Sequence, residues 1–371
     1  MRARMPELLL ILLGCCCLVF QAGSSCAQER RALLIAISAY PNASDRLGGP
    51  NQDLVLMESL LRNWYGFKKI TVLKNEQATR SAIVAELQKL SRSNPKDIIV
   101  IYYTGHGASY RGGLEAIFPV DGDRRNLKSV LTKSELSRLL GQIPSSRLTL
   151  VLDCCYSDLF TKSPKRPRLK CVEMDLPPED AAASWTEKAP VVHRPGHTVV
   201  TAGNRVPDTT FHFARTSKTS EAVDVSALTA ALYRCLIERP KRSASAVVRE
   251  SGAHIKSLKI DQVPGVVGSD LQQDVFGGPS AGVGPRTLPV IDITSKQVVA
   301  GGGGLCGVRP GGNLEMLDSR GKSLGCVQVT GSTWKSTTVA RLRASKPARI
   351  RFGSDSIAAR IWASIHYITG R

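Results

Sequence analysis

The first two thirds of the chain alternate continuous apolar runs with segments of helical periodicity. A run that is apolar at every position fits a strand buried on both faces of a sheet. Apolar residues three and four positions apart instead give a helix one apolar face. The runs at residues 31–39, 69–73, 97–103 and 147–152 therefore predict strands, and the periodic segments at residues 51–64, 79–90 and 131–140 predict helices.

Strands that alternate with helices predict an α/β fold with a mostly parallel sheet flanked by helices. Sheets of this kind place their functional sites beyond the carboxyl ends of the strands. Any candidate chemistry is therefore expected directly after residues 97–103 and 147–152.

The character of the chain changes after residue 277. Glycine and proline dominate residues 278–289, which we interpret as a linker following a main domain at residues 28–277. Short runs with strand-forming composition come next, and they predict a small β-rich domain at residues 290–371. These runs are residues 290–293, 314–317 and 326–330.

The amino terminus has the pattern of an export signal. Arg2 and Arg4 precede an apolar stretch at residues 8–20, and Ser25-Cys26-Ala27 offers a small-residue cleavage site. We expect residues 1–27 to be removed and the protein to be exported, either periplasmic or secreted. The apolar stretch is shorter than the roughly 17–25 residues of a membrane-spanning helix, which is the alternative. Leu12-Leu13-Gly14-Cys15 also resembles a lipobox, so a lipid anchor on Cys15 is a further alternative.

Net charge and cysteine content restrict the possible functions less than the hydrophobic pattern does. The formal net charge is +19, but the basic residues are spread along the chain and aromatic residues make only 5% of it. This distribution favours affinity for anionic surfaces over specific nucleic-acid binding. The ten cysteines do not form a disulfide framework. Cys306 and Cys326, 20 positions apart, are the candidate pair in an oxidising compartment, and whether they bond is left to the geometry of the fold.

The candidate chemistry follows two of the predicted strands. Gly105-His106-Gly107 comes after residues 97–103, and Asp153-Cys154-Cys155 comes after residues 147–152. A thiol becomes a good nucleophile once it is deprotonated, and a nearby imidazole promotes this. His106 and Cys155 are therefore the predicted catalytic pair. The backbone N–H groups of Gly107 and Cys155 are the predicted oxyanion hole.

These residues resemble a known family. Tyr103-Thr104-Gly105-His106-Gly107 is similar to the metacaspase Tyr-Ser-Gly-His-Gly, and residues 153–157 are similar to its Asp-(Ser/Cys)-Cys-His-Ser. Weaker similarities follow in the same order, so the resemblance covers residues 30–277. These stretches are residues 32–38, 47–57, 117–121, 198–203, 226–229 and 262–276.

The resemblance implies a caspase-like fold and a cysteine endopeptidase that works through a thioester acyl-enzyme. It makes the second cysteine, Cys155, the nucleophile, and it makes Cys154 the neighbouring thiol that faces the sheet. Gln52, Tyr156 and Asp158 depart from the family pattern. The last two flank the nucleophile, where they bear on specificity and efficiency.

Acidic positions indicate the substrate preference. Asp53 and Asp153 match metacaspase acids that line the pocket for a basic residue, and Thr104 is assigned to the same pocket. The resemblance therefore implies cleavage after Arg or Lys, because a carboxylate at the base of a pocket selects a cation. The alternative is that Asp53 caps its helix and Asp153 accepts backbone hydrogen bonds.

A polar, proline-containing stretch at residues 159–197 is predicted to be an exposed loop. It contains a basic run at residues 162–170. In caspase-like enzymes the corresponding connection is cut during activation, so Lys165, Arg166 and Arg168 are candidate sites of self-cleavage. The alternative is a solvated insertion with no such role.

We expect no bound metal and no required cofactor, because no acidic loop has calcium-ligand spacing. Calcium activation is implied by the resemblance alone. The expected partners are protein or peptide substrates. Two alternative functions remain open, namely a catalytically silent caspase-like binding module and a cell-envelope protein that binds anionic polymer.

Overall fold

The structure is a computed structural model of the whole chain. It describes residues 28–110, 114–154, 170–176, 194–203, 211–213, 223–279, 287–293, 297–301, 313–317, 323–332, 336–340 and 349–352. The predicted signal segment at residues 1–27 lies outside these ranges. Among the helices that are described, none is long and apolar enough to cross a membrane.

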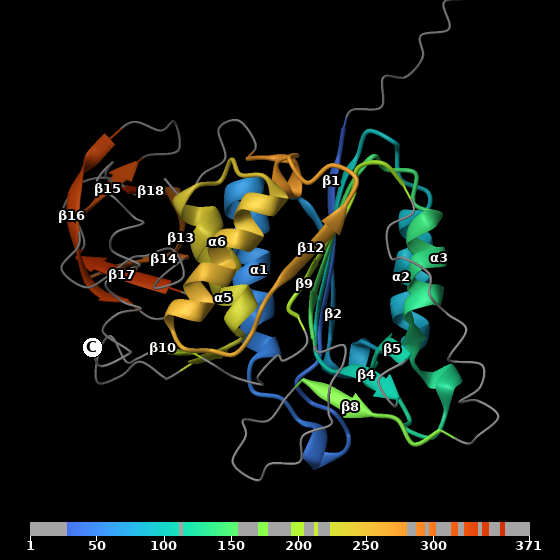
Figure 1. Cartoon of the computed structure of the whole chain (residues 1–371). Coiled ribbons are helices and arrows are strands. Elements are labelled where there is room, and N and C mark those ends of the chain that lie inside the picture. The colour runs from blue at the N-terminus through green and yellow to red at the C-terminus, as the bar shows by residue number, and fades with distance from the viewer. Residues whose placement is uncertain are drawn as a thin grey trace, which may run out of the picture.

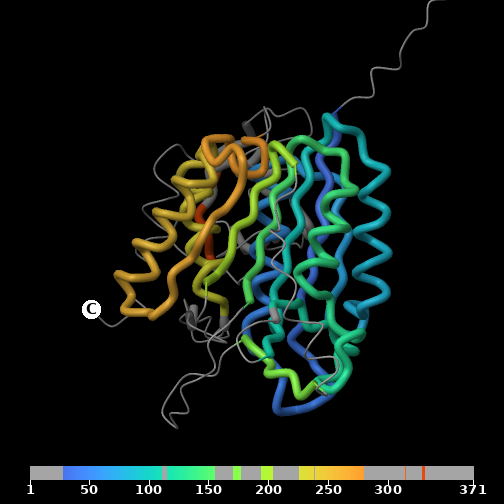
Figure 2. Tube along the Cα trace, turned by 45° about the vertical axis from the view of Figure 1, so that its right-hand side comes forward, coloured from blue at the N-terminus to red at the C-terminus, as the bar shows by residue number. Residues whose placement is uncertain are grey.

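A six-stranded sheet forms the centre of the fold, in the order β12-β9-β7-β3-β1-β2. Five strands are parallel, and the edge strand β12 runs antiparallel to β9. Figure 2 shows these strands side by side. Their bounds are β1 Arg30–Ala36, β2 Lys69–Lys74, β3 Ile98–Thr104, β7 Arg147–Asp153, β9 His197–Thr201 and β12 Gly265–Gly268.

Helices cover both faces of the sheet, and Figure 1 shows the two layers. One face carries α1 (Pro50–Tyr65), α5 (Ala227–Glu238) and α6 (Ala244–Ser257) over one apolar core. The other face carries α2 (Arg80–Leu90) and α3 (Lys133–Gly141) over a second core. β3 is buried at every position, as its apolar run predicts. The predicted fold class, a parallel sheet flanked by helices, is confirmed.

A second, smaller sheet lies at the carboxyl end of the parallel strands, near the bottom of Figure 1. Its order is β6-β5-β4-β8, and the pattern of the sequence did not predict it. A further antiparallel pair joins β10 and β11. The bounds are β4 Gly107–Tyr110, β5 Leu114–Ile117, β6 Leu131–Thr132, β8 Cys171–Glu173, β10 Phe211–Phe213 and β11 Val223–Val225.

The prediction that residues 159–197 form one exposed loop is wrong for the part that the structure describes. β8 pairs in parallel with β4, and Lys170 is completely buried. Val172, Met174 and Leu176 are also buried, at every second position, which is the burial pattern of a strand with one face on the core. His197, at the other end of the range, is buried as the first residue of β9.

The remaining elements are short. Four 3-10 helices are η1 (Ala43–Asp45), η2 (Asn75–Gln77), η3 (Leu127–Ser129) and η4 (Val275–Gly277).

Six strands toward the carboxyl terminus pair as a closed barrel in the order β13-β14-β17-β16-β15-β18. β13 begins inside the range predicted as a linker. The bounds are β13 Thr287–Ile293, β14 Gln297–Gly301, β15 Asn313–Leu317, β16 Ser323–Ser332, β17 Ser336–Ala340 and β18 Arg349–Phe352.

Candidate active site

His106 lies between the end of β3 and the start of β4, and its side chain is buried. Its Nε2 is 2.8 Å from the backbone oxygen of Asp45. A carbonyl oxygen only accepts, so Nε2 carries the hydrogen in this contact. In the neutral ring Nδ1 then holds the lone pair, and it is the nitrogen that can take up a proton.

The backbone around His106 is held from several sides. Its N–H donates to the Tyr40 hydroxyl at 2.9 Å, and its carbonyl accepts from the Tyr103 hydroxyl at 2.5 Å. The Tyr40 ring also contacts the imidazole, with ring centroids 4.9 Å apart. A Cβ on Gly105 would lie 2.8 Å from the Tyr103 hydroxyl oxygen. Glycine is therefore required at position 105 if His106 is to keep this place.

The carbonyl that receives the His106 Nε2–H is itself positioned by an ion pair. Arg124 Nη2 lies 2.6 Å from Oδ1 of Asp45. Asn42 caps the short helix η1, in which Asp45 is the last residue. Two residues far from His106 in the sequence thus help to fix the orientation of its ring.

Cys154 is completely buried and belongs to the apolar core on the α2 and α3 side of the sheet. This is where a thiol that faces the sheet should lie. Cys155, predicted as the nucleophile and as an oxyanion donor, lies outside the described residues. The same holds for Tyr156, Asp158 and the candidate self-cleavage residues Lys165, Arg166 and Arg168.

Asp53, Thr104 and Asp153, predicted to bind substrate, lie together at the carboxyl ends of β3 and β7. We call them, together with Ser226, which is the N-cap residue of α5, and Thr229 in the first turn of α5, the acidic pocket. Oδ2 of Asp53 accepts from the Thr104 hydroxyl at 2.8 Å, and its Oδ1 accepts from the Ser226 N–H at 2.8 Å. The Thr229 hydroxyl donates to Oδ2 of Asp153 at 2.5 Å. All five residues are fully buried.

These bonds decide one of the open alternatives. The N-cap of α1 is Gly49, and no side chain makes a cap hydrogen bond there. Asp53, in the first turn, instead bonds to residues on β3 and at the start of α5. Asp53 therefore does not cap its own helix.

The side chain of Lys170 fills the acidic pocket. Its Nζ lies 2.8 Å from the Thr104 hydroxyl oxygen, 3.2 Å from Oδ2 of Asp53 and 3.5 Å from Oδ1 of Asp153. It also donates to the hydroxyl of Ser226. A buried ammonium is tolerated only where charges and hydrogen bonds compensate its lost hydration, and this pocket supplies both.

Two carboxylates surround one ammonium, and the pKa of Asp153 reflects the balance. Burial raises the pKa of this carboxyl, the charge of Lys170 lowers it, and the charge of Asp53 raises it again. The net direction is upward. Burial, the largest of these causes, therefore outweighs the attraction of Lys170 for this carboxyl.

The backbone of Lys170 takes part in the parallel pairing of β4 with β8. Its carbonyl oxygen accepts a hydrogen bond from the N–H of Gly107 at 3.0 Å. Gly107 is the glycine that supplies one of the two predicted oxyanion donors. The residues that follow continue as β8, with Cys171 opposite Gly107 in the register.

Several of these residues carry no local signal in the sequence. Lys170 ends a basic run that is typical of a solvated loop, and its partner Asp53 is far away in the chain. Ser226 and Thr229 lie in a stretch similar to metacaspases, but nothing in their spacing indicates the pocket. The Asp45 contact uses a backbone oxygen, which any residue type could provide.

Metal and disulfide sites do not appear among the described side chains. Within that part of the chain, no three His, Cys, Asp or Glu residues gather in a way that could hold a metal ion. None of the cysteines described there forms a disulfide. The expected Cys306–Cys326 pair lies outside this part, because residues 302–312 are not described.

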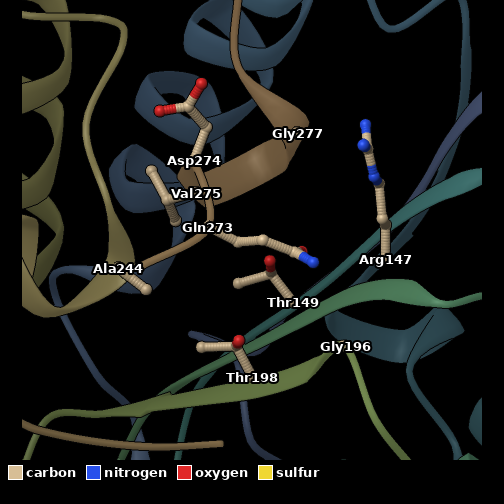
Figure 3. Close-up of a pocket in the computed structure, with 9 residues that line it drawn as sticks. All are labelled: Arg147, Thr149, Gly196, Thr198, Ala244, Gln273, Asp274, Val275 and Gly277. Carbon is tan, nitrogen blue, oxygen red and sulfur yellow. The ribbon is translucent and has the colours of Figure 1, made fainter. Parts of the chain in front are cut away.

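A small polar pocket lies elsewhere on the sheet, and Figure 3 shows it. Arg147 and Thr198 stand near the amino ends of β7 and β9, whereas His106 and the acidic pocket lie at the carboxyl ends. No thiol or imidazole lines it. The lining residues are Arg147, Thr149, Gly196, Thr198, Ala244, Gln273, Asp274, Val275 and Gly277.

A parallel sheet with a Gly-His-Gly turn and an acidic pocket at its carboxyl edge defines a caspase-like class of protein. The Caspase domain family model matches residues 29–276, and the chain belongs to this family.

Curated relatives are metacaspases. Metacaspase-1 of Schizosaccharomyces pombe is 28% identical over 153 residues, which cover 36% of this chain and 35% of that protein. Metacaspase-9 of Arabidopsis thaliana is 28% identical over 149 residues, or 35% of this chain and 44% of that protein. The chain thus spans less than half the length of these relatives.

Two solved structures are also similar. A protein of Geobacter sulfurreducens has a TM-score of 0.49 at 18% identity, covering 67% of this chain and 98% of that one. The structure of pro-sf-caspase-1 has a TM-score of 0.43 at 15% identity, covering 65% of this chain and 88% of that one.

Proposed function

We propose that this protein is a cysteine endopeptidase that hydrolyses peptide bonds after Lys or Arg, with His106 and Cys155 as its catalytic dyad. One observation carries the proposal. The acidic pocket encloses a lysine ammonium while the carbonyl of the same lysine accepts from the Gly107 N–H. Membership in the Caspase domain family supports cysteine peptidase chemistry.

Each described residue has a role in this reaction. The acidic pocket binds the cationic side chain before the scissile bond, so it orients the substrate. The Gly107 N–H points at the carbonyl oxygen of that residue, where it stabilises the negative charge of the tetrahedral intermediate. The Asp45 carbonyl holds the Nε2–H of His106, so that Nδ1 is the proton-carrying atom.

The chemistry then follows the usual course of thiol acyl transfer. The thiolate of Cys155 attacks the carbonyl carbon, and the imidazolium of His106 protonates the leaving amine. Water hydrolyses the resulting thioester, and the thiol is restored. No step of this reaction needs a metal or an organic cofactor, so the proposal includes no required cofactor. The proposal also includes export of the protein.

A peptidyl electrophile with Arg before its reactive group tests the dyad. Because Lys170 fills the pocket, labelling is measured in the wild-type chain and in Lys170→Gln. We expect label at Cys155, located by peptide mapping, and loss of label in Cys155→Ala. His106→Ala should label far more slowly, by about 10²-fold or more, since general acid–base groups contribute factors of this size.

Cys154→Ala is the matched control, because it removes the adjacent thiol and leaves the dyad. Label that survives Cys155→Ala but disappears in Cys154→Ala would reassign the nucleophile. Failure of both the wild type and Lys170→Gln to label or to cleave Arg peptides would favour a catalytically silent binding module.

A further inference from the structure

Asp45 contacts two different residues through two different groups. Its backbone oxygen accepts the Nε2–H of His106 at 2.8 Å, and its carboxylate pairs with Arg124, whose Nη2 lies 2.6 Å from Oδ1. The carbonyl and the side chain are attached to the same Cα, so a contact that holds the carboxylate also limits rotation of the carbonyl. Arg124 therefore reaches the catalytic imidazole through a single intervening residue.

The turn that carries Asp45 has little stability of its own. η1 is a single 3-10 turn of three residues, and such turns have poorer hydrogen bonds than an α-helix. The bond that closes it, from the Arg46 N–H to the Ala43 carbonyl, is long at 3.4 Å. Asn42, Ala43 and Ser44 are exposed, whereas Asp45 is buried. Contacts from outside the turn are therefore needed to fix the Asp45 carbonyl.

Two further bonds hold this segment, but neither orients the Asp45 carboxylate from outside the turn. The Leu47 N–H donates to the Ser38 carbonyl at 2.9 Å, which fixes the chain after the turn. The Ser44 hydroxyl donates to Oδ1 of Asp45 at 3.2 Å, but Ser44 is an exposed residue of the same turn. The Arg124 ion pair instead joins the carboxylate to the connection between β5 and β6.

The backbone of Arg124 is also held in place. Its carbonyl oxygen accepts the N–H of Asp175 at 2.8 Å, and Asp175 lies just after β8. The next residue, Arg125, has its Nε 3.7 Å from Oδ2 of Asp175, with both side chains 82% exposed. The side chain of Arg124 is 43% exposed, and that of Asp45 is 11% exposed. Of these two adjacent arginines, the first contacts the residue that bonds His106 and the second makes a solvated pair.

The Arg124–Asp45 pair should matter more for catalysis than for folding. A partly exposed ion pair adds little to the stability of a fold, because water and salt screen it. Geometry at a reacting centre is more demanding, since a displacement of about 1 Å can lower the rate by about 10²-fold. Loss of the Arg124 side chain should therefore leave the fold intact and slow the reaction.

We propose that Arg124 is a positioning residue of the catalytic dyad. It holds the Asp45 carboxylate, so that the Asp45 carbonyl stays on the Nε2–H of His106 and Nδ1 stays directed for proton transfer. The proposal rests on the proposed peptidase function and adds to it a residue that neither local spacing nor the resemblance to metacaspases marks. Arg124 acts through Asp45 and takes no part in the chemistry itself.

Steady-state hydrolysis of a fluorogenic Arg peptide measures the effect on rate. The variants are made in whichever background hydrolyses the peptide faster, wild type or Lys170→Gln. Arg124→Gln should lower kcat by about 10-fold to 10²-fold and leave KM within about twofold, because the acidic pocket is untouched. Arg124→Lys should recover part of the loss, since it keeps the cation. Arg125→Gln is the matched control and should be as fast as its parent.

A double-mutant cycle tests whether Arg124 acts through Asp45. Asp45→Asn keeps the backbone carbonyl but removes the charge that Arg124 binds, so it should lower kcat to a similar extent. Arg124→Gln combined with Asp45→Asn should then be no slower than either single change, because two residues that act through one contact are not additive. Losses that multiply in the double variant would contradict this route.

The imidazole itself gives a readout that does not depend on activity. In protein labelled with ¹⁵N at histidine and carrying Cys155→Ala, the Nε2–H of His106 should give a proton signal that exchanges slowly with water. Arg124→Gln should speed this exchange by about tenfold or more, because the bond to the carbonyl opens more often. His197 is the internal reference, since its buried Nε2 lies 3.0 Å from a backbone oxygen at the amino end of the parallel strands.

The positioning role and the peptidase function fail separately. If hydrolysis depends on Cys155 but Arg124→Gln is as fast as Arg125→Gln, the positioning role is wrong and the peptidase stands. If neither background hydrolyses Arg peptides, the peptidase is rejected, and the exchange rate at His106 alone decides the positioning role. A changed His197 signal in Arg124→Gln would show that Arg124 stabilises the fold instead of orienting the imidazole, which would also overturn the proposal.

Discussion

At the scale of single residues, the acidic pocket shows how charge balance creates a binding preference. Asp53 and Asp153 face one ammonium, and both are fully buried. Removing one partner from a buried ionic group costs several kcal/mol, because the remaining charge is left uncompensated. The pocket therefore needs a cation of its own or from a substrate, and neutral side chains are poor replacements.

The raised pKa of Asp153 gives a stability prediction. The folded protein holds this proton more tightly than the unfolded chain does, so the contribution of Asp153 to stability is present at low pH and is lost as pH rises through the folded pKa. Compared with Asp153→Asn, a chain with Asp153 should gain stability as the pH falls from neutral toward the ordinary carboxyl pKa of 3.8. Urea unfolding of both proteins, each carrying Cys155→Ala to prevent processing, measures the difference.

A loss of stability on acidification, relative to Asp153→Asn, would contradict this prediction. A carboxyl whose pKa is lowered by its ion pair would lose stability relative to the Asn variant on acidification. That result would mean that the attraction of Lys170 outweighs the burial of Asp153.

At the scale of elements, the turn from β3 into β4 fixes the catalytic geometry. Gly105 is the point of closest approach, since a Cβ there would lie 2.8 Å from the Tyr103 hydroxyl oxygen and 3.0 Å from that of Tyr40. Both hydroxyls hold the backbone of His106. A side chain at position 105 would therefore push the imidazole away from its place.

Gly105→Ala should reduce peptide hydrolysis by about 10²-fold, because small misplacements of reacting groups have effects of this size. Gly252→Ala is the matched control. It lies in α6, where an added Cβ meets ordinary contacts with Pro264 at 3.4 Å. The control should keep its activity and gain up to about 1 kcal/mol of stability from helix propensity. Equal activity of the two variants would show that the turn tolerates a side chain.

Much of the fold could be predicted from elements whose signal is local. The apolar runs of β1, β3 and β7 and the periodicity of α1 and α2 place the sheet and its helices within a few residues of the observed bounds. β8 was missed, although Val172, Met174 and Leu176 alternate with polar residues as a half-buried strand does. Its short length and the basic run before it favoured a loop.

The residues of the candidate site also fall into those with a local sequence signal and those without one. Asp53, Thr104 and Asp153 could be predicted because each is next to a recognisable motif. The insertion of Lys170 among them could not, because it depends on a contact between residues that are 117 positions apart. Such pairing follows from the topology of the folded chain, and no local pattern records it.

At the scale of the whole molecule, the connection between β7 and β9 divides the fold across its centre. Residues before it supply β1, β2, β3 and β7, and residues after it supply β9, β12, α5 and α6. β7 and β9 pair in parallel from Leu148 opposite His197 to Leu152 opposite Thr201. The core on the α1 side contains residues from both pieces. The two pieces on either side of this connection thus share a continuous sheet and core.

A chain that is broken in this connection should therefore remain a single particle. We expect the two fragments to elute together in size-exclusion chromatography in buffer and to separate on a denaturing gel. Residues 28–170 and 171–371, co-expressed as separate chains with Cys155→Ala, provide these two fragments in a form that does not depend on activity. Fragments that elute separately in buffer would show that the covalent connection holds the halves together.

The residue that follows the pocket lysine has one more consequence. Cys171 is the first residue of β8, and burial raises the pKa of its thiol in the intact chain. A second fragment that begins at Cys171, once its initiator methionine is removed, carries an amino-terminal cysteine, in which a free amine and a thiol share one residue. This 1,2-aminothiol condenses with aldehydes and cyanobenzothiazoles, a reaction that an internal cysteine does not undergo. A protein that is split at this bond would carry its own chemical tag, which distinguishes split from intact molecules in a mixture.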